Sequence, residues 1–560
     1  MKISRRQFLN YSGVAATASL LGSLSHCHRS AKRSDRPNII ILFSDELALE
    51  YLSCYGGKIS TPNLDKLAAN GLRFTNAFSA APMCTPSRFG LLTGRYPGHC
   101  SHPDFLADYP TDEPYVIAWN TFVDSSIPTV ARILSQNGYT TGMAGKWHVG
   151  KLPDHLERPQ FEADDDPTDE AVDRKLRKHQ EIMAEQVKKD AGFDYAASVA
   201  WDNFDTFPVA KLRYHNFPWI TKGAVDFLEQ QAKRDQPFFL YVATTAVHGP
   251  HHAEAFKQDL RYTAGGKIDA VTQFALPSTE IQSRLEQIPA HETHRYAGMA
   301  CLDHHLGVLR QKLEQLNLAE NTLIFFMADH NTEPGKATCF DKGFRVPMLV
   351  SWPGKITPNT STHALVQSVD ILPTILDAAQ VPLEPALKLY GKSLVPIFSE
   401  TGTRIRDYVY LESGYARAIS DGEYKYIALH FPPKIIQQME NGTLDYAPNH
   451  LNVWKQAHSQ IAIEHYPAYF DPDQLYDLKN DPYEQHNLAS DPAHQAVLKR
   501  LKVALRQQLA TFDHPYDLTE APFMKSEKYR QLVRKTQAIG TDYIPWLPRD
   551  HGKIVWPPVE

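Results

Sequence analysis

The chain has 560 residues, more than one ordinary hydrophobic core supports, so we expect one large domain and a smaller one. Hydrophobic residues make up 42% and charged residues 22% of the chain, and the mean hydropathy is −0.39, which excludes a disordered or membrane-spanning chain. The net charge of −6 gives no general basic surface, so we expect no nucleic-acid partner.

The N-terminus has the pattern of an export signal. Arg5 and Arg6 precede a small-residue apolar run at 14–24, which is typical of a twin-arginine signal. Cys27 follows a segment similar to a lipoprotein cleavage box, although His26 stands where a small residue is usual. We assign residues 1–33 to the signal and expect a periplasmic or cell-surface protein, in contact with a membrane only if Cys27 is lipidated.

Three apolar runs of strand length end at acidic or histidine side chains. Open α/β sheets present ligand-binding residues at the carboxyl ends of their strands, so we expect these ends to meet. The runs and the residues at their ends are 39–43 with Asp45 and Glu46, 238–243 with His248, and 322–328 with Asp329 and His330.

Helical patterns alternate with these runs. They cover 63–70, 128–137 and 222–233, and the first two stop at Gly71 and Gly138, which are typical C-terminal caps. This alternation predicts a large, mostly parallel sheet flanked by helices.

The pattern changes twice along the chain. The segment 154–189 is dense in charge, and we expect an inserted helical excursion with a solvated face. After residue 400, short alternating segments with a hairpin signal, followed by an amphipathic helix at 492–512, predict a smaller α+β domain with an antiparallel sheet. The tail at 543–560 is expected to wrap the surface. The predicted domains are therefore 34–400 and 401–560.

The most specific motif is C-T-P-S-R at 84–88, followed by L-L-T-G-R at 91–95. The six cysteines lack the spacing of a zinc site or a disulfide scaffold, so Cys84 needs another explanation. Pro82 and Pro86 favour an exposed loop, and a helix from about Pro86 would let Arg88 steady the side chain of Cys84.

Three further motifs contain cations and histidines. The first is G-K-W-H-V-G at 145–150, in which a lysine can neutralise an anion and a histidine can move a proton near neutral pH. The second places His248 in H-G-P-H, just after the apolar run that ends at residue 243. The third is K-A-T-C-F-D-K-G-F-R-V-P at 336–347, which offers Lys336 and Lys342.

Together and in this order, the motifs resemble those of type I sulfatases, the formylglycine-dependent enzymes of the alkaline phosphatase superfamily, over about residues 37–488. The resemblance implies an alkaline phosphatase-like fold and hydrolysis of sulfate esters. It also implies that a maturation enzyme oxidises Cys84 to formylglycine (3-oxoalanine), whose hydrate attacks sulfur with one hydroxyl and later expels sulfate with the other. One bound Ca²⁺ would polarise the sulfate.

The resemblance also assigns roles to individual residues. It implies sulfate binding by two lysines, of which Lys336 matches the family position while Lys342 stands at a usual glycine. It implies that His148 takes a proton from the diol and that His248 protonates the leaving alcohol. The full catalytic set is Cys84, Arg88, Lys146, His148, His248 and Lys336.

The implied calcium ligands are Asp45, Glu46, Asp329, His330 and the modified Cys84. Glu46 stands where many members have aspartate, and its extra methylene could shift the cation or change its coordination. His330 stands where members have asparagine or histidine, although nitrogen is a poor calcium ligand.

Two other functions are compatible with these motifs. A phosphonate monoester or phosphodiester hydrolase of the same superfamily shares the metal scaffold, and an inactive carbohydrate-binding relative would keep only recognition. Export and loops rich in histidine and aromatic residues favour a sulfated polysaccharide or oligosaccharide as the substrate. The candidate subsite residues are Trp201, Asp202, Asn203, His215, His251 and Arg417.

Overall fold

The computed structural model describes residues 36–250, 252–289, 293–384, 387–450, 457–519 and 521–538. The predicted export signal, Cys27, His251 and the tail at 543–560 lie outside the described residues. Within the described ranges, no helix is both long enough and apolar enough to cross a membrane.

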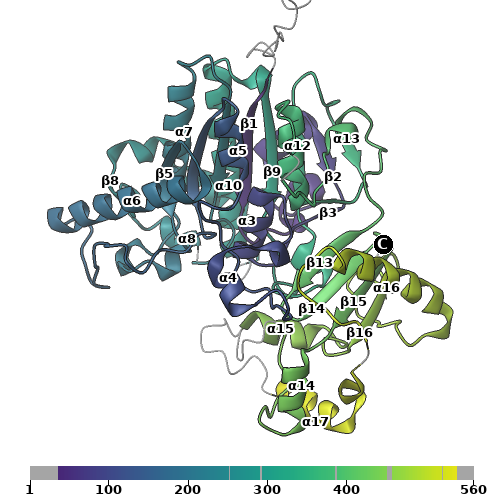
Figure 1. Cartoon of the computed structure of the whole chain (residues 1–560). Coiled ribbons are helices and arrows are strands. Elements are labelled where there is room, and N and C mark those ends of the chain that lie inside the picture. Colours follow the sequence, from purple (N-terminus) through teal and green to yellow (C-terminus); the bar gives the residue numbers. More distant parts are fainter. Residues whose placement is uncertain are drawn as a thin grey trace, which may run out of the picture. The chain divides into compact units, whose positions relative to one another are not determined.

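A sheet of eight strands organises the larger part of the chain (Figure 1). All neighbouring strands are parallel except β10, which runs antiparallel to both of its neighbours. The three predicted apolar runs are the adjacent strands β9, β1 and β6, and all their residues are buried, as expected for a sheet covered on both faces. In sheet order the strands are β11 (Thr360–Thr362), β2 (Leu72–Phe74), β10 (Met348–Ser351), β9 (Thr322–Ala328), β1 (Asn38–Ser44), β6 (Phe238–Ala243), β4 (Thr140–Lys146) and β5 (Tyr195–Ala200).

Two groups of helices flank this sheet (Figure 1). In one group α10 (Thr293–Gln315) contacts α2 (Pro62–Ala69) and α7 (Phe217–Gln231). In the other, α3 (Cys84–Thr93), α5 (Val130–Gln136) and α12 (Ile371–Ala378) contact one another. The helix predicted at 222–233 begins five residues earlier, because Asn216 caps it by accepting from the backbone N–H of Trp219.

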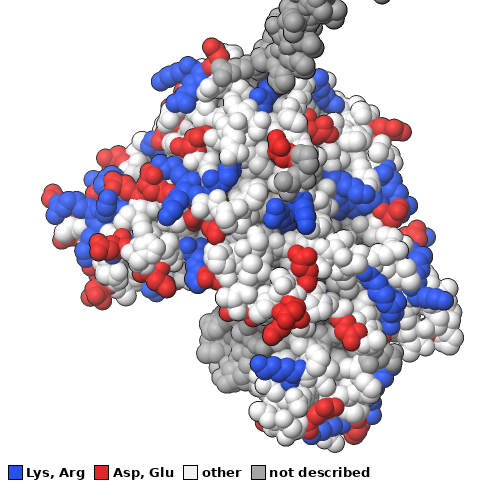
Figure 2. Space-filling model, in the orientation of Figure 1, with Lys and Arg blue, Asp and Glu red and all other residues white. Residues whose placement is uncertain are grey.

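The charged segment forms a helix only in its second part, α6 (Glu170–Ala191), whereas residues 154–169 are turns and loop. Asp169 caps α6 by accepting from the backbone N–H groups of Ala171 and Val172. Charges of both signs alternate along this helix (Figure 2) and form ion pairs such as Asp173 with Arg177, at 2.7 Å. The prediction of a solvated surface helix is confirmed for α6.

The C-terminal part contains a second, antiparallel sheet of β13 (Val409–Ser413), β14 (Ala416–Ser420), β15 (Tyr424–Leu429) and β16 (Asp473–Asp477) (Figure 1). The predicted hairpin is β14–β15, and the predicted final helix, α16 (Gln495–Leu509), packs on these two strands. The fold class is confirmed: a large, mostly parallel sheet between helices and a smaller α+β part.

Candidate active site

The ends of adjacent strands bring the predicted acidic residues together. Strands β1 and β9 pair in parallel register up to Ser44 opposite Ala328, so Asp45 and Asp329 follow side by side. Both side chains are fully buried. The backbone N–H groups of Glu46 and His330 donate to Asp329 Oδ1 at 3.0 and 2.8 Å, which fixes the orientation of this carboxylate.

Cys84 is not in the exposed loop that the flanking prolines suggested. It is the first residue of α3, and the whole helix is buried. Pro86 is accommodated at the third helical position because the N–H groups of the first turn have no partner within the helix. Cys84, the predicted nucleophile, therefore lies at a buried helix N-terminus, where the helix dipole favours negative charge.

Arg88 lies one turn further along α3 and contacts the acids rather than Cys84. Its Nη2 donates to Asp329 Oδ2 at 2.9 Å and to Asp45 Oδ2 at 3.4 Å. A buried guanidinium thus bridges the ends of β1 and β9, and it neutralises much of the charge that they carry.

Four of the five predicted metal ligands form one buried group: Asp45, Cys84, Asp329 and His330 have ligand atoms within 4.8 Å of one another. Cys84 Sγ lies 3.5 Å from Asp45 Oδ1 and 3.2 Å from His330 Nε2. His330 Nδ1 donates to the carbonyl of Asn331 at 2.7 Å, which leaves Nε2 unprotonated in the neutral ring and able to ligate. Two carboxylates, an imidazole nitrogen and an oxygen on a modified Cys84 fit a divalent cation.

Glu46, the fifth predicted ligand, is directed to different partners. Its Oε2 accepts from Lys336 Nζ at 2.5 Å and lies 3.5 Å from His248 Nε2, while Oε1 pairs with Arg295 Nη2 at 3.0 Å. It lies outside the four-residue group. Because the side chain of Glu46 is longer than that of an aspartate, its carboxylate reaches Lys336 and Arg295.

Cations outweigh burial in setting the ionisation of these acids. Burial would raise the pKa of Asp45, but Lys146, with Arg88 and nearby histidines, holds it well below its usual range. Lys336 and Arg295 act in the same way on the pKa of Glu46. Three carboxylates therefore face four cationic side chains, a setting that suits an additional anion.

The thiol of Cys84 is a poor nucleophile in this environment. Burial, and then the neighbouring charge of Asp45, raise its pKa above the usual range. Since a thiolate is the reactive form, an unmodified Cys84 would be largely inert at neutral pH.

The two predicted catalytic histidines lie at the half-buried entrance of the cluster. His148 Nε2 lies 3.1 Å from Asp202 Oδ1, and its Nδ1 has no hydrogen-bond partner among the described residues. His248 Nδ1 donates to the carbonyl of Gly249 at 3.0 Å, and its Nε2 accepts from Asn203 Nδ2 at 3.4 Å. Burial, with Lys336, lowers the pKa of His248 to about 3, and burial, with Lys146, lowers that of His148.

Sequence reasoning treated Asp202 and Asn203 as substrate contacts, but the structure places them against catalytic groups. Asn203 Oδ1 also accepts from Lys146 Nζ. Both residues follow the end of β5, so the same rule of polar residues at strand ends could have found them. Arg295, on α10, carried no sequence signal.

Other expectations for single residues have clear outcomes. Lys336 is buried against Glu46, whereas Lys342 pairs with Glu50 near the surface. His215 is buried and supports the loop that carries His248: its ring forms hydrogen bonds with Thr245 Oγ1 and the carbonyl of Pro250. Arg417, a candidate subsite residue, is fully buried and donates to the backbone carbonyls of Gly414, Ala416 and Tyr115.

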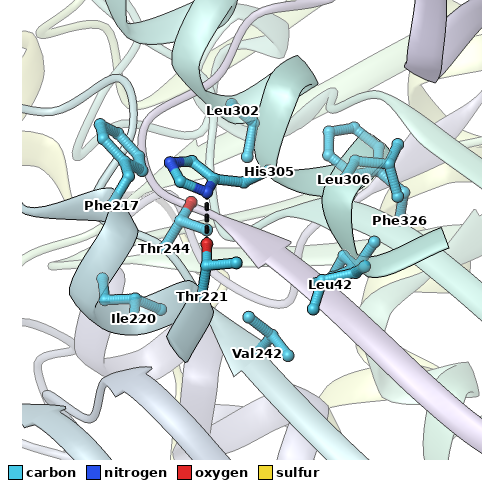
Figure 3. Close-up of a pocket in the computed structure, with 11 residues that line it drawn as sticks. Leu42, Phe217, Ile220, Thr221, Val242, Thr244, Leu302, His305, Leu306 and Phe326 are labelled. Carbon is cyan, nitrogen blue, oxygen red and sulfur yellow. Dashed lines mark hydrogen bonds between the residues drawn. The ribbon is translucent and has the colours of Figure 1, made fainter. Parts of the chain in front are cut away.

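A small cavity beside this site is mainly apolar, unlike the charged cluster (Figure 3). It measures about 10 Å³, room for about one water molecule. Its walls are mainly apolar side chains, and within them Thr221 Oγ1 hydrogen-bonds His305 Nδ1. We regard it as a packing gap between α7, α10 and the sheet.

Fold and site together define an alkaline phosphatase-like hydrolase. The sulfatase family model matches residues 37–381. Human arylsulfatase A is 30% identical over 526 residues, covering 84% of this chain and 88% of that protein. An N-acetylgalactosamine-6-O-sulfatase of Bacteroides thetaiotaomicron is 26% identical, covering 85% of this chain and 94% of that protein.

Solved structures show the same architecture. The crystal structure of Ps i-CgsB in complex with k-i-k-neocarrahexaose has a TM-score of 0.57 at 20% identity, covering 89% of this chain and 100% of that chain. The chain belongs to the sulfatase family of the alkaline phosphatase superfamily and is a sulfuric ester hydrolase.

Proposed function

We propose that this enzyme removes sulfate from a sulfated polysaccharide or its oligosaccharides, with a nucleophile made from Cys84 and a divalent cation, Ca²⁺, at the ends of β1 and β9. The observation that carries the proposal is the convergence of Cys84, its acidic neighbours and four cations in one buried cluster. The carbohydrate substrate is supported by the relatives, one named for a sulfated amino sugar and one crystallised with an oligosaccharide.

The proposed reaction needs two groups that are added after synthesis, the divalent cation and the formylglycine made from Cys84. Asp45, Asp329 and His330 would hold the cation, which polarises the sulfate, and conversion of Cys84 to formylglycine would supply the attacking hydroxyl. The maturation enzyme that makes this conversion is the protein partner that we propose.

The chain's own cations bind and orient the sulfate. Lys146 pairs with Asp45 and Lys336 pairs with Glu46, and both lysines are buried. In a water-poor site such fixed charges stabilise the negative charge that develops on the sulfate oxygens.

His248 is the proposed general acid. Its pKa is low in the substrate-free protein, and a bound sulfate ester would raise that pKa through its negative charge, so that Nε2 takes up from solvent the proton that it then donates to the leaving oxygen. Glu46, 3.5 Å from Nε2, favours the protonated form. His148, oriented by Asp202, is placed to move the proton of the attacking hydroxyl.

The test joins mass spectrometry to sulfate release. We expect the peptide containing Cys84 to carry formylglycine after co-expression with a maturation enzyme, and the protein then to release sulfate from defined sulfated sugars. Cys84→Ala should fold and lose turnover, while Cys54→Ala, a half-buried cysteine outside the cluster, should keep it. Full activity of Cys84→Ala would refute the mechanism. A persistent thiol without turnover would favour an inactive binding protein.

A parallel assay separates the related reaction. We expect aryl sulfate to be hydrolysed faster than an aryl phosphodiester or phosphonate monoester. The reverse preference would assign the chain to the phosphonate and phosphodiester hydrolases of the superfamily.

We also propose export to the periplasm or cell surface, on the basis of the N-terminal sequence. Cell fractionation tests this directly. If Cys27 is lipidated, the protein will sediment with membranes and Cys27→Ala will release it.

A further inference from the structure

A polar pocket of about 310 Å³ lies outside the candidate active site. Four parts of the chain line it: the start of α4 (Pro103–Asp108), residues 123–125, residues 151–154, and the last turn of α6. None of its lining residues belongs to the catalytic cluster.

Asp190, at the end of α6, contributes a buried carboxylate to this pocket. It is 5% exposed, and only its Oδ1 is satisfied, by Gln186 Nε2 at 2.7 Å. Its Oδ2 has no hydrogen-bond partner within the described part of the chain, and the charges that act on the carboxylate are those of Asp124, Lys189 and Arg132. A buried carboxylate oxygen without a partner is costly unless a cation or a proton joins it.

The remaining lining is acidic as well. Four aspartates line the pocket against two lysines, and Lys151 is already bonded to Asp104 Oδ2 at 2.5 Å. Asp124 and Asp190 both line this pocket. His102 adds no positive charge, because burial lowers its pKa and its Nδ1 accepts from the backbone N–H of Asp104. Such a surface repels sulfate and phosphate and attracts cations.

We propose that this pocket is a second metal site, which binds one hydrated divalent cation, calcium or magnesium, through the carboxylates of Asp190 and Asp124. Among the described residues, only the active-site group brings three or more ligand atoms within 4.8 Å, so water supplies the rest of the coordination shell here. The pocket, of about 310 Å³, has room for an ion and its waters.

The proposed metal site adjoins the segment that carries Lys146 and His148. The lining segment 151–154 directly follows Lys146 and His148, and a Cβ built on Gly150 would lie 2.4 Å from Trp147 Nε1 and 3.2 Å from Asp190 Oδ2. A cation held by Asp190 would therefore stabilise the backbone that positions these two catalytic side chains.

Metal counting on the full-length enzyme tests the proposal. Metal-stripped protein is equilibrated with Ca²⁺, or separately with Mg²⁺, and bound metal per chain is measured by mass spectrometry. We expect Asp190→Asn to bind one ion fewer than the wild type, and Asp45→Asn, which disables the active-site group, to retain the ion that depends on Asp190. The comparison of the two metals identifies the preferred ion.

Two further variants complete the design. Asp164→Asn, at an exposed aspartate outside the pocket, should bind as the wild type does. If Asp190→Asn fails to fold, Asp124→Asn should weaken the Asp190-dependent ion by about tenfold or more. In the Asp45→Asn background, the metal should raise Tm, and adding Asp190→Asn should abolish that rise. Equal metal content in the wild type and Asp190→Asn would overturn the proposal and leave the pocket filled with water only.

Discussion

Asp45 and Asp190 are both buried aspartates, and the protein treats them in opposite ways. Cations around Asp45 hold its pKa well below the usual range despite complete burial. At Asp190, burial and the charge of Asp124 outweigh the weaker effects of Lys189 and Arg132 and raise the pKa to about 7. Burial alone therefore does not fix the state of a carboxylate: the placement of counter-charges does. Asp45 therefore stays ionised, whereas Asp190 in the outer pocket is protonated below about pH 7 unless a cation joins it.

The largest expected effect comes from removing the central counter-charge of the active site. Arg88→Met removes the buried guanidinium that pairs with Asp329 and leaves Asp45 with Lys146 alone, so we expect the free energy of unfolding to fall by about 3–5 kcal/mol. Urea denaturation measures it. The matched control is Arg174→Met on α6, whose exposed pair with Glu170 should be worth about 0.5 kcal/mol or less. A loss below about 1 kcal/mol for Arg88→Met would show that other groups compensate the acids.

The next effect concerns rate. Lys336→Ala removes a buried cation from the sulfate position, and we expect kcat/KM for sulfate release to fall by roughly 10²–10³, equivalent to about 2.7–4 kcal/mol. Lys342→Ala, in the same motif but paired with Glu50, should change it by less than about threefold. Equal losses in the two variants would contradict the choice between these lysines.

The outer pocket predicts a pH effect of the opposite sign to that of Asp45. The pKa of Asp190 is about 7 in the folded chain and 3.8 when unfolded, so the folded state binds the proton more tightly. Its stabilising contribution is greatest below pH 3.8 and is lost as the pH rises to about 7, by up to about 1.4 kcal/mol per pH unit. We expect wild-type stability in chelator to fall over this range relative to Asp190→Asn.

Divalent metal should suppress this difference, because it binds the ionised carboxylate. Chemical denaturation of the two proteins at several pH values, with and without metal, measures it. If the stabilities of the wild type and Asp190→Asn change with pH in the same way in chelator, Asp190 has a counter-charge in solution.

The smallest expected effect lies at the entrance of the active site. Asp202→Asn removes the carboxylate 3.1 Å from His148 Nε2, and we expect kcat/KM to fall by about tenfold, at the low end of general acid–base contributions. The acid limb of the pH–rate profile should move to lower pH, because His148 loses a partner that favours its protonated form. Asp235→Asn, at an exposed aspartate, should leave the profile unchanged. An unshifted profile in Asp202→Asn would reduce Asp202 to a structural role.

Local chemistry explains what could be predicted. The apolar runs that became β1, β6 and β9 are continuous because both faces of a parallel sheet are buried, and their polar ends follow from the same geometry. The short strands β2, β10 and β11 were not predicted, because segments of three or four residues carry too little periodicity.

The sequence by itself determined the class of fold and the family, and it indicated Cys84, Asp45, Asp329, Lys146 and His248 as site residues, because their motifs are contiguous and the strand rule places their ends together. Tertiary structure decided the rest, since it depends on contacts between distant segments. Only folding buried Cys84 at the start of α3 and turned Glu46 towards Lys336 and Arg295. It also set Asp202 against His148 and Asn203 against His248, and it left Asp190 Oδ2 without a hydrogen-bond partner among the described residues.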